Sequence, residues 1–288
     1  MRSGRPRETT EDENISIVAI SVFDHHLTPR AILQELDLNV SARTIDRRLQ
    51  EAGLFGRVAL RKQVFDEDDK KKRLSFAEGY KNWTEEQWER VVFADEAIVQ
   101  GYGGSKSGRE FVRRPKGLKE AFKSEYMAHT LPHPVQLNIW ACFSASGLGY
   151  CHIHNETLNG KSFTRILDDN LLASADLLFT ETPRQQWWFL QDNAPTHRAN
   201  VAQTWLHNHG VNSLDFPPYS PDLNPIENLW QHLEKRVEAR IPSEFEELQD
   251  VIADEWTKTP IDFLIKLAHS MPKRCLAVIA AGGDHTHY

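Results

Sequence analysis

The sequence predicts two parts of different fold class: a small all-α domain near the N-terminus and, from about residue 91, an α/β domain. The first prediction rests on three short runs between residues 11 and 56 with apolar residues at helical spacing. The second rests on strand-like apolar runs that alternate with longer amphipathic helices, which is typical of a mixed sheet flanked by helices. A chain of 288 residues is long enough for a large packed core.

Composition and charge exclude several classes of protein. The chain is 40% hydrophobic and 26% charged, as in ordinary folded proteins. Its 34 Lys and Arg against 41 Asp and Glu give a net charge of −7, so nucleic-acid binding through bulk positive charge is excluded and would need local patches. The longest apolar run, Ile15–Phe23, is too short to cross a bilayer, so we expect no membrane partner.

Residues 1–10, MRSGRPRETT, are basic and have no apolar periodicity, so we expect a flexible arm. Three helices are expected in residues 11–56. Thr28 before a proline predicts the start of the second, Ser41 caps the third, and Gly53 ends it. The residues expected to face the core are Ile15, Val18, Ala19 and Val22 in the first helix, and Ala42, Ile45, Leu49 and Ala52 in the third.

The last two helices of residues 11–56 are joined by the tight turn 38–40, and the second of them carries Arg43, Arg47 and Arg48 on its open face. This layout predicts a helix-turn-helix, a motif that places its second helix in the DNA major groove. The arginines could contact bases or phosphates, or could form a solvated helix face. The preceding turn favours DNA binding.

Residues 57–90 are interpreted as a charged linker that contains a helix toward Trp83 and Trp88, and 91–288 as the α/β domain. Within the linker, Lys70–Arg73 could be a nuclear-import signal or part of a salt-bridged exposed helix. The strands expected in the α/β domain are Arg90–Ala94, Val135–Phe143, Gly149–His154 and Gln186–Leu190. The helices expected there are Lys161–Leu172, Ala199–His207, Pro225–Arg240, Glu244–Thr257 and Ile261–His269.

Three acidic residues fall where an expected strand or helix meets a loop. Asp95 follows the first strand on the same face as Phe93, so its charge points toward apolar surroundings and needs a compensating cation or hydrogen bonds. Asp192 lies at the carboxyl end of another strand, where open α/β sheets place their sites. Glu227 begins a helix entered through residues 216–225, which contain four prolines. The stiffness of that segment preorganises the helix start.

Carboxylates that converge from separate elements suit a hard cation such as Mg²⁺, and two such ions support phosphodiester chemistry. Each residue also has a structural interpretation. Asp95 could be the buried partner of an arginine, and Asp192 could form an Asx turn or a helix cap. Glu227 could close a capping box with Asn224.

Three segments resemble the catalytic domain of the mariner superfamily of cut-and-paste DNA transposases. They are VVFADEA around Asp95, LQDNAPTH around Asp192 and FPPYSPDLNPIENLWQHLEKRV around Glu227. Asp192 and Glu227 are separated by 34 residues, the spacing of one branch of that superfamily. Further strings look similar to the same family: NIWACFSASGLG (138–149), FVRRPKG (111–117) and SMPKRCLAVIAAGG (270–283).

The resemblance implies a ribonuclease-H-like fold for residues 91–288. It also implies a catalytic Asp-Asp-Glu triad, Asp95, Asp192 and Glu227, that binds two ions of Mg²⁺ or Mn²⁺. Glu96 would then be a neighbour on the opposite face of the strand and not a ligand. The activity implied is cleavage at transposon terminal inverted repeats and joining of the ends to TA target DNA.

The N-terminal segment resembles the same family in part. Gly4–Arg7 is similar to the arm that links two DNA-binding modules in these transposases, which implies that Arg5 and Arg7 enter a minor groove. Residues 11–56 correspond to the second module, and the first, expected upstream, is missing from the sequence. We therefore expect residual metal-dependent nicking without efficient end-specific transposition.

The leading hypothesis is a metal-dependent DNA transposase that binds double-stranded DNA, acts as a homodimer and is located in the nucleus. The main alternative is a DNA-binding protein derived from such a transposase that no longer transposes. A third interpretation makes the α/β domain a dimerisation platform. The intact triad favours retained chemistry, whereas the missing module favours loss of mobility.

Overall fold

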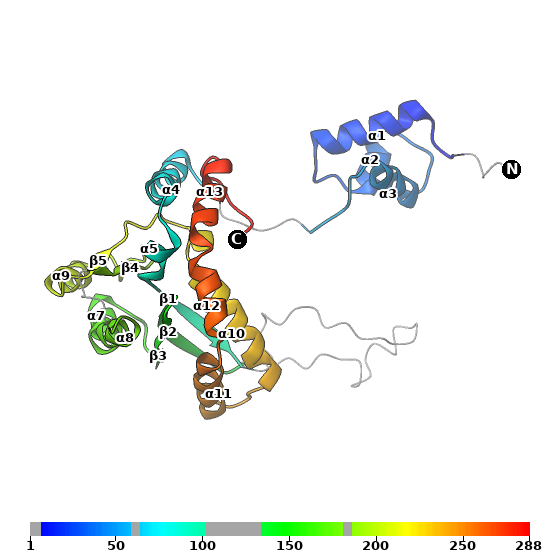
Figure 1. Ribbon diagram of the computed structural model, residues 1–288. Helices are drawn as coiled ribbons and strands as arrows, with labels where there is room; N and C mark the ends of the chain where they lie inside the picture. Colours follow the sequence, from blue (N-terminus) through cyan, green and yellow to red (C-terminus); the bar gives the residue numbers. More distant parts are fainter. Residues whose placement is uncertain (1–6, 59–63, 102–133, 181–185) are drawn as a thin grey trace. The chain divides into compact units, whose positions relative to one another are not determined.

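The computed structural model describes residues 7–58, 64–101, 134–180 and 186–288. The chain divides into two compact units, Met1–Val64 and Phe65–Tyr288, and each is described by itself (Figure 1). The smaller unit is all-α, and the larger is a mixed sheet flanked by helices, as the sequence predicts.

The smaller unit contains three helices, α1 (Glu11–Phe23), α2 (Pro29–Glu35) and α3 (Ala42–Glu51). Each begins at a hydroxyl side chain that accepts a hydrogen bond from a backbone N–H left free in the first turn. Thr28 and Ser41 do so for α2 and α3, which confirms both predicted starts. Thr10 does so for α1 and forms a reciprocal capping box with Glu13. Gly53, with φ of 81°, follows the end of α3.

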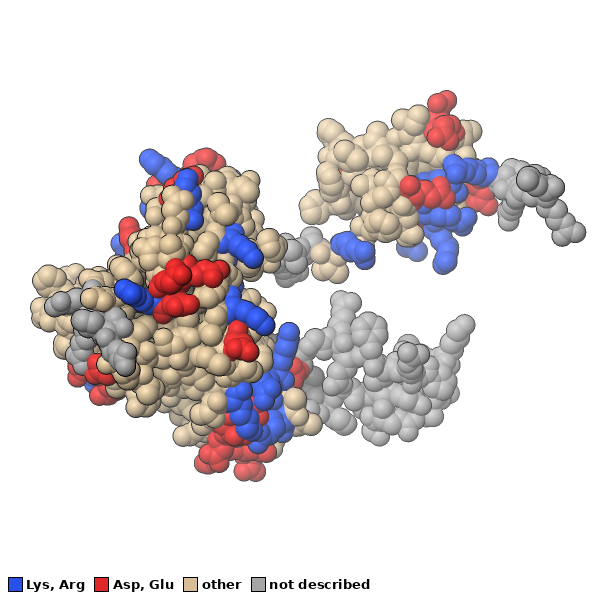
Figure 2. Space-filling view, viewed as in Figure 1, with Lys and Arg blue, Asp and Glu red and all other residues tan. Residues whose placement is uncertain are grey.

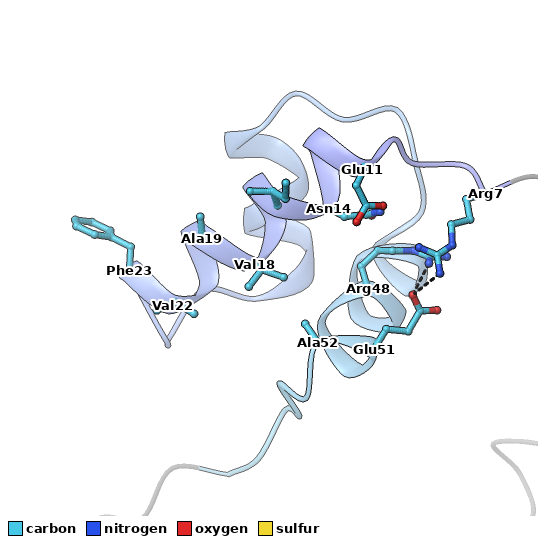
Figure 3. A pocket seen from close by; sticks show the side chains of 11 residues that line it. Arg7, Glu11, Asn14, Val18, Ala19, Val22, Phe23, Arg48, Glu51 and Ala52 are labelled. Atoms are coloured by element: carbon cyan, nitrogen blue, oxygen red, sulfur yellow. Dashed lines mark hydrogen bonds and ion pairs between the residues drawn. The ribbon is translucent and has the colours of Figure 1, made fainter.

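The predicted core face of α1 is wrong. Ile17 is fully buried, whereas Ile15 is 62% exposed and Val22 is 51% exposed. The helix is apolar on two sides, and a three-helix unit has room to bury only one of them. The predicted stripe instead lines an open hollow together with Phe23 (Figure 3). Of the predicted core residues of α3, Ile45 and Leu49 are buried, Ala42 is partly buried, and Ala52 is exposed.

The larger unit is built on a five-stranded sheet with strand order β3-β2-β1-β4-β5. The central strand, β1, runs antiparallel to β2 and parallel to β4. The strands are β1 (Val91–Gln100), β2 (Gln136–Ser144), β3 (Gly147–His154), β4 (Trp188–Leu190) and β5 (Asn212–Ser213).

Helices cover both faces of this sheet (Figure 1). One layer contains α7 (Gly160–Ile166), the π-helical turn η2 (Leu167–Leu171), α8 (Leu172–Leu178) and α9 (Asn200–Asn208). The other contains α10 (Ile226–Arg240), α11 (Phe245–Thr257), α12 (Ile261–Ala268) and α13 (Met271–Ala280). Strand alternation divides the core accordingly. Val92 and Ala94 pack toward the first layer, and Val91 and Phe93 toward the second.

The linker predicted over residues 57–90 is largely structured. α4 (Glu67–Tyr80) and α5 (Glu85–Glu89) belong to the larger unit, because Phe76 and Trp88 are buried in its core. Arg73 is also buried, with 0% exposure, so the basic run Lys70–Arg73 is not a uniformly exposed face. The sequence pattern did not reveal this because a lone arginine in a charged helix is usually solvated.

Among the helices in the described parts of the chain, none combines the length and the apolarity needed to cross a membrane.

Candidate active site

Asp95 lies on β1, and Asp192 lies two residues past the end of the neighbouring strand β4. The parallel pairing of β1 and β4 ends at Phe93 and Leu190, so each aspartate is two residues beyond the last pair. β1 itself continues to Gln100 because its pairing with β2 does not stop there. The prediction that Asp95 lies at the end of its strand is therefore wrong. Asp95 lies within β1, just beyond the end of the parallel pairing with β4.

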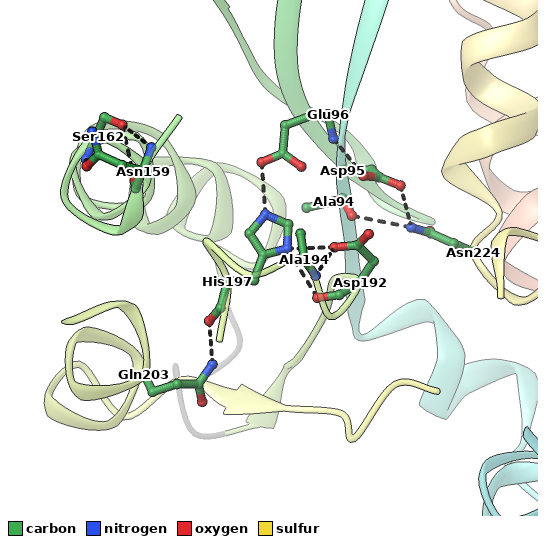
Figure 4. A network of polar contacts seen from close by, with 10 residues as sticks. All are labelled: Ala94, Asp95, Glu96, Asn159, Ser162, Asp192, Ala194, His197, Gln203 and Asn224. Atoms are coloured by element: carbon green, nitrogen blue, oxygen red, sulfur yellow. Dashed lines mark hydrogen bonds and ion pairs between the residues drawn. The ribbon is translucent and has the colours of Figure 1, made fainter. Parts of the chain in front are cut away.

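The segment before Glu227 is tied directly to Asp95. Asn224 is buried, and its side-chain amide donates to Asp95 Oδ2 at 3.3 Å and to the backbone carbonyl of Ala94 at 3.4 Å. Its side-chain oxygen accepts from the Ile226 N–H at the start of α10 at 3.4 Å. One side chain thus connects the strand that carries Asp95 to the helix that carries Glu227 (Figure 4).

A capping box involving Glu227 receives no support from the backbone. Such a box needs the N–H of Asn224 to donate to the Glu227 side chain. That N–H donates instead to the Pro221 carbonyl at 3.0 Å, within the 3₁₀ turn η4 (Pro221–Leu223) that precedes α10. The proline-rich segment also contacts the Asp192 loop, where the Asn193 side chain donates to the Phe216 carbonyl.

The charges of Asp192 and Glu227 both act on Asp95. Burial raises the pKa of Asp95 well above its ordinary value of 3.8, and the charges of Glu96, Asp192 and Glu227 raise it further. For Asp192, burial also raises the pKa, but hydrogen bonds from His197 and the Ala194 N–H lower it more, so the result is a lowered pKa. The surroundings therefore stabilise the ionised form of Asp192, whereas they destabilise the ionised form of Asp95.

His197 joins this group as a buried cation. Its ring, only 2% exposed, lies between Asp192 and Glu96, which is on the opposite face of β1 from Asp95, as expected (Figure 4). Burial alone would lower the pKa of His197, but the hydrogen bonds to Asp192 and Glu96 raise it to about 10. The imidazolium offsets part of the negative charge of the cluster.

A second buried network fixes the proline-rich segment. Arg73 from α4 donates to both oxygens of Asp222, at 2.8 and 2.7 Å, and to the Gly283 carbonyl at 2.8 Å. Thr286 donates to the same carboxylate at 2.8 Å, and Arg274 from α13 donates to the Asp222 carbonyl at 2.7 Å. The backbone five residues before Glu227 is thereby held from three other segments of the chain.

The donor set fits a divalent cation. Across the described ranges, no group of three or more His, Cys, Asp or Glu side chains is arranged to hold a metal ion as it stands. Even so, burial and the neighbouring carboxylates both raise the pKa of Asp95, and a bound cation would favour its ionised form. Carboxylate oxygens are the ligands that Mg²⁺ prefers. Asp95, Asp192 and Glu227 are the residues available to hold it.

Comparison with known proteins decides the family. A family model described as "DDE superfamily endonuclease" matches residues 90–249, more than half of the chain, and a second, described as "Transposase", matches residues 16–82. The chain belongs to the DDE superfamily endonucleases, in the Tc1/mariner transposase branch.

Curated relatives of this DDE-family chain cover nearly its full length. It is 32% identical to the transposable element Tcb1 transposase of Caenorhabditis briggsae over 90% of this chain and 96% of that protein. It is 30% identical to the transposable element Tc1 transposase of Caenorhabditis elegans over 86% of this chain and 88% of that protein. This homology suggests a DNA transposase, and membership of the family implies nuclease or transposase activity.

Among solved structures, the mariner Mos1 paired end complex with Mg superposes with a TM-score of 0.81 at 19% identity. The match covers 100% of this chain and 82% of that one. At this identity the likeness shows the fold, which is the ribonuclease-H-like fold that the sequence resemblance implied.

The arginines expected to bind DNA are placed differently from one another in this DDE-family chain. Arg43 and Arg47 are exposed one turn apart on α3, and Arg7 is exposed at the edge of the smaller unit. Arg48 is only 7% exposed and donates to Glu51 at 2.5 Å, so it stabilises the helical unit and does not lie on the open face. Arg7 also lies 3.7 Å from Glu51 (Figure 3).

Figure 2 shows Lys and Arg side chains gathered on one part of the smaller unit. Arg5 and the string 111–117 fall outside the described residues.

Sequence reasoning missed two functional side chains of this DDE-family site. Asn224 was predicted to be a helix cap, and it also holds Asp95. Glu96 was predicted to be a neighbour on the opposite face of the strand and not a metal ligand, and its side chain binds His197. A signal for the second was available: alternation puts Glu96 on the face opposite Asp95, where a partly buried carboxylate needs a partner.

Proposed function

We propose that this chain is a DNA transposase that cuts DNA at the terminal inverted repeats of a transposable element and joins the ends to TA target sites. The observation that supports the proposal is that Asp192 and Glu227, from two other segments, both raise the pKa of the buried Asp95, in a chain of the DDE family. Phosphodiester chemistry uses this kind of hard oxygen site.

Asp95, Asp192 and Glu227 would hold two ions of Mg²⁺ or Mn²⁺. When bound, the ions activate an attacking oxygen and stabilise the leaving oxygen. The chain's own residues orient the ligands: Asn224 holds Asp95, and His197 holds Asp192. Burial of Asp95 also removes water that would screen its charge, which strengthens its attraction for a cation.

The smaller unit is proposed to bind double-stranded DNA. Arg43 and Arg47 of α3 would contact the major groove, and the arm with Arg5 and Arg7 a minor groove. Because the net charge of the chain is −7, DNA binding has to come from these local groups. The proposal includes a homodimer that acts in the nucleus, because two element ends must be cut and joined together.

The catalytic part is tested by a nicking assay on supercoiled DNA with the full chain. Nicking is expected only with Mg²⁺ or Mn²⁺, and Glu227→Gln should abolish it while thermal unfolding stays nearly unchanged, because Gln preserves shape and polarity. If Glu227 served mainly to cap α10, Gln would preserve cleavage. DNA binding by the wild type with no metal-dependent nicking would contradict the proposal and favour a DNA-binding protein derived from a transposase.

The DNA-binding part is tested by affinity for A·T-rich duplex at several salt concentrations. The double variant Arg43→Ala/Arg47→Ala should weaken binding and make the salt dependence shallower, by about one unit of slope for each phosphate that the protein no longer neutralises. Arg165→Ala, an exposed arginine of the catalytic unit, is the matched control and should leave the slope unchanged. An unchanged slope in the double variant would contradict the assignment.

A further inference from the structure

His197 is held in a fixed place between two carboxylates that are far apart in sequence. Its Nδ1 lies 2.7 Å from Asp192 Oδ1, and its Nε2 lies 3.0 Å from Glu96 Oε1. The backbone N–H of His197 donates to the Ala194 carbonyl at 2.9 Å. The Phe163 ring packs against the imidazole, with ring centroids 4.2 Å apart. A ring held on every side in this way has little freedom to turn.

The two nitrogens of that ring have different tasks. Glu96, on β1, fixes the Nε2 end, so the Nδ1 end is presented to Asp192 at a set angle. The Asp192 side chain is 45% exposed and would otherwise rotate freely at the rim of the site. The ion pair with His197 Nδ1 and the hydrogen bond from the Ala194 N–H, at 2.9 Å, both involve the same oxygen, Oδ1. His197 Nδ1 also lies within hydrogen-bonding distance of the Asp192 backbone carbonyl, at 3.1 Å. The other oxygen, Oδ2, is engaged by neither donor.

We infer that His197 is a positioning residue, anchored by Glu96, that holds the Asp192 carboxylate with Oδ2 directed to a divalent metal ion. The inference rests on the proposed function. It extends that function by giving Glu96 and His197 a task in it, although neither binds the metal.

A pair of substitutions separates this task from simple packing. In His197→Asn, the amide nitrogen is as many bonds from the backbone as Nδ1, so it can donate to Asp192 but cannot reach Glu96. In His197→Gln, the amide nitrogen is as many bonds away as Nε2, so it can reach Glu96 but leaves Asp192 without its side-chain donor. Both variants lose one of two buried hydrogen bonds, so both should lower the thermal unfolding temperature by similar amounts.

The measurement is Mn²⁺ binding to the full chain by titration calorimetry without DNA, with thermal unfolding recorded on the same samples. His197→Gln should weaken Mn²⁺ binding about 10- to 100-fold, as is typical when a residue that orients a metal ligand is removed. His197→Asn should bind Mn²⁺ nearly as the wild type does. If affinity instead follows the unfolding temperature in both variants, the role of His197 is packing and the inference is overturned.

Glu96 provides a second test that does not depend on changing His197. Glu96→Ala removes the anchor and should weaken Mn²⁺ binding, by less than His197→Gln, whereas Glu96→Gln keeps an oxygen that can accept from Nε2 and should retain it. Equal affinities in these two variants would also overturn the inference.

Asp192→Asn distinguishes the two levels of the argument. Wild-type Mn²⁺ binding that is lost in Asp192→Asn but kept in His197→Gln overturns the positioning role and leaves the proposed function intact. Failure of the wild type to bind Mn²⁺ overturns both.

Discussion

The catalytic unit contains two buried polar networks, and each fixes one carboxylate segment of the site by a different route. The network at Asp222 is closed to solvent: Arg73 is 0% exposed and Asp222 5%. It holds the backbone around Asp222, and in this way it also fixes the start of the helix that carries Glu227. The network at Asp192 is open on one side, with the carboxylate 45% exposed, and holds the side chain itself.

This difference in exposure determines whether the loss of each network should lower stability or disturb the geometry of the metal site. A buried charge deprived of its partner stays buried, so the cost appears as stability. A carboxylate at the rim that loses its donor can rotate into water, so the cost appears as geometry at the metal site. The same pairing chemistry therefore supports folding in one place and ligand orientation in the other.

The largest expected effect comes from removing half of the Asp222 network with its helix. A fragment of residues 91–288 lacks α4 and α5, and with them Arg73 and the core residues Phe76 and Trp88. It should show no cooperative thermal unfolding, whereas residues 65–288 should unfold cooperatively. Circular dichroism during heating checks both. A cooperative transition in the shorter fragment would show that the network at Asp222 is dispensable.

The next effect is the loss of the buried carboxylate alone. Asp222→Ala leaves the Arg73 guanidinium buried and unpaired, which should cost about 3–5 kcal/mol of unfolding free energy. For a unit of this size that corresponds to a fall in the unfolding temperature of roughly 6–20 °C. Chemical denaturation measures the first quantity and heating the second.

The double variant Arg73→Met/Asp222→Leu is the control for this experiment. Because it removes both charges together, it should regain much of the lost stability. No recovery would indicate that the other partner of the carboxylate, Thr286, matters more than the ion pair.

Acid should weaken the closed network next. Burial raises the pKa of Asp222, but the hydrogen bond and charge of Arg73 lower it more, so its folded pKa lies below the ordinary 3.8. The stabilisation is therefore fully present above about pH 3.8 and is lost as the pH falls through the lowered value. Unfolding free energies measured between pH 6 and pH 3 should fall more steeply in the wild type than in the double variant. Parallel curves would exclude Asp222 as the source.

The smallest effect on stability is expected where a single local hydrogen bond caps a helix. Thr10→Ala removes the cap of α1 in the smaller unit and should cost about 1 kcal/mol. Thr10→Ser retains the hydroxyl and should cost little. Thermal unfolding of the three proteins compares them. A loss of stability as large as that of Asp222→Ala would mean that local caps and long-range networks stabilise the protein equally.

That distinction also explains what the sequence could predict. The caps at Thr28 and Ser41 involve partners three residues away, so a local pattern is sufficient to find them. Asp192 was expected at the carboxyl end of a strand, and it lies two residues past the end of β4. The pairing of Arg73 with Asp222 spans 149 residues, and that of His197 with Glu96 spans 101, so no local pattern reports either.

Two wrong predictions have the same physical origin. Helical periodicity finds an apolar stripe on α1, but the helix is apolar on two sides, and the choice of Ile17 over Ile15 for the core depends on how α2 and α3 pack against it. A charged composition suggested that residues 57–90 were a linker, although Phe76 and Trp88 are core residues. In both cases tertiary packing, which a local sequence pattern does not report, determined which residues are buried.

The closed network at Asp222 also sets an order of events during synthesis. The three helices of the smaller unit make their caps and core within residues 10–54, so this unit can fold as soon as it leaves the ribosome. The network around Asp222 lacks its members Gly283 and Thr286 until those residues have been made, 61 and 64 residues later. The proposed DNA-binding unit can therefore be folded before the network that fixes the catalytic unit is complete.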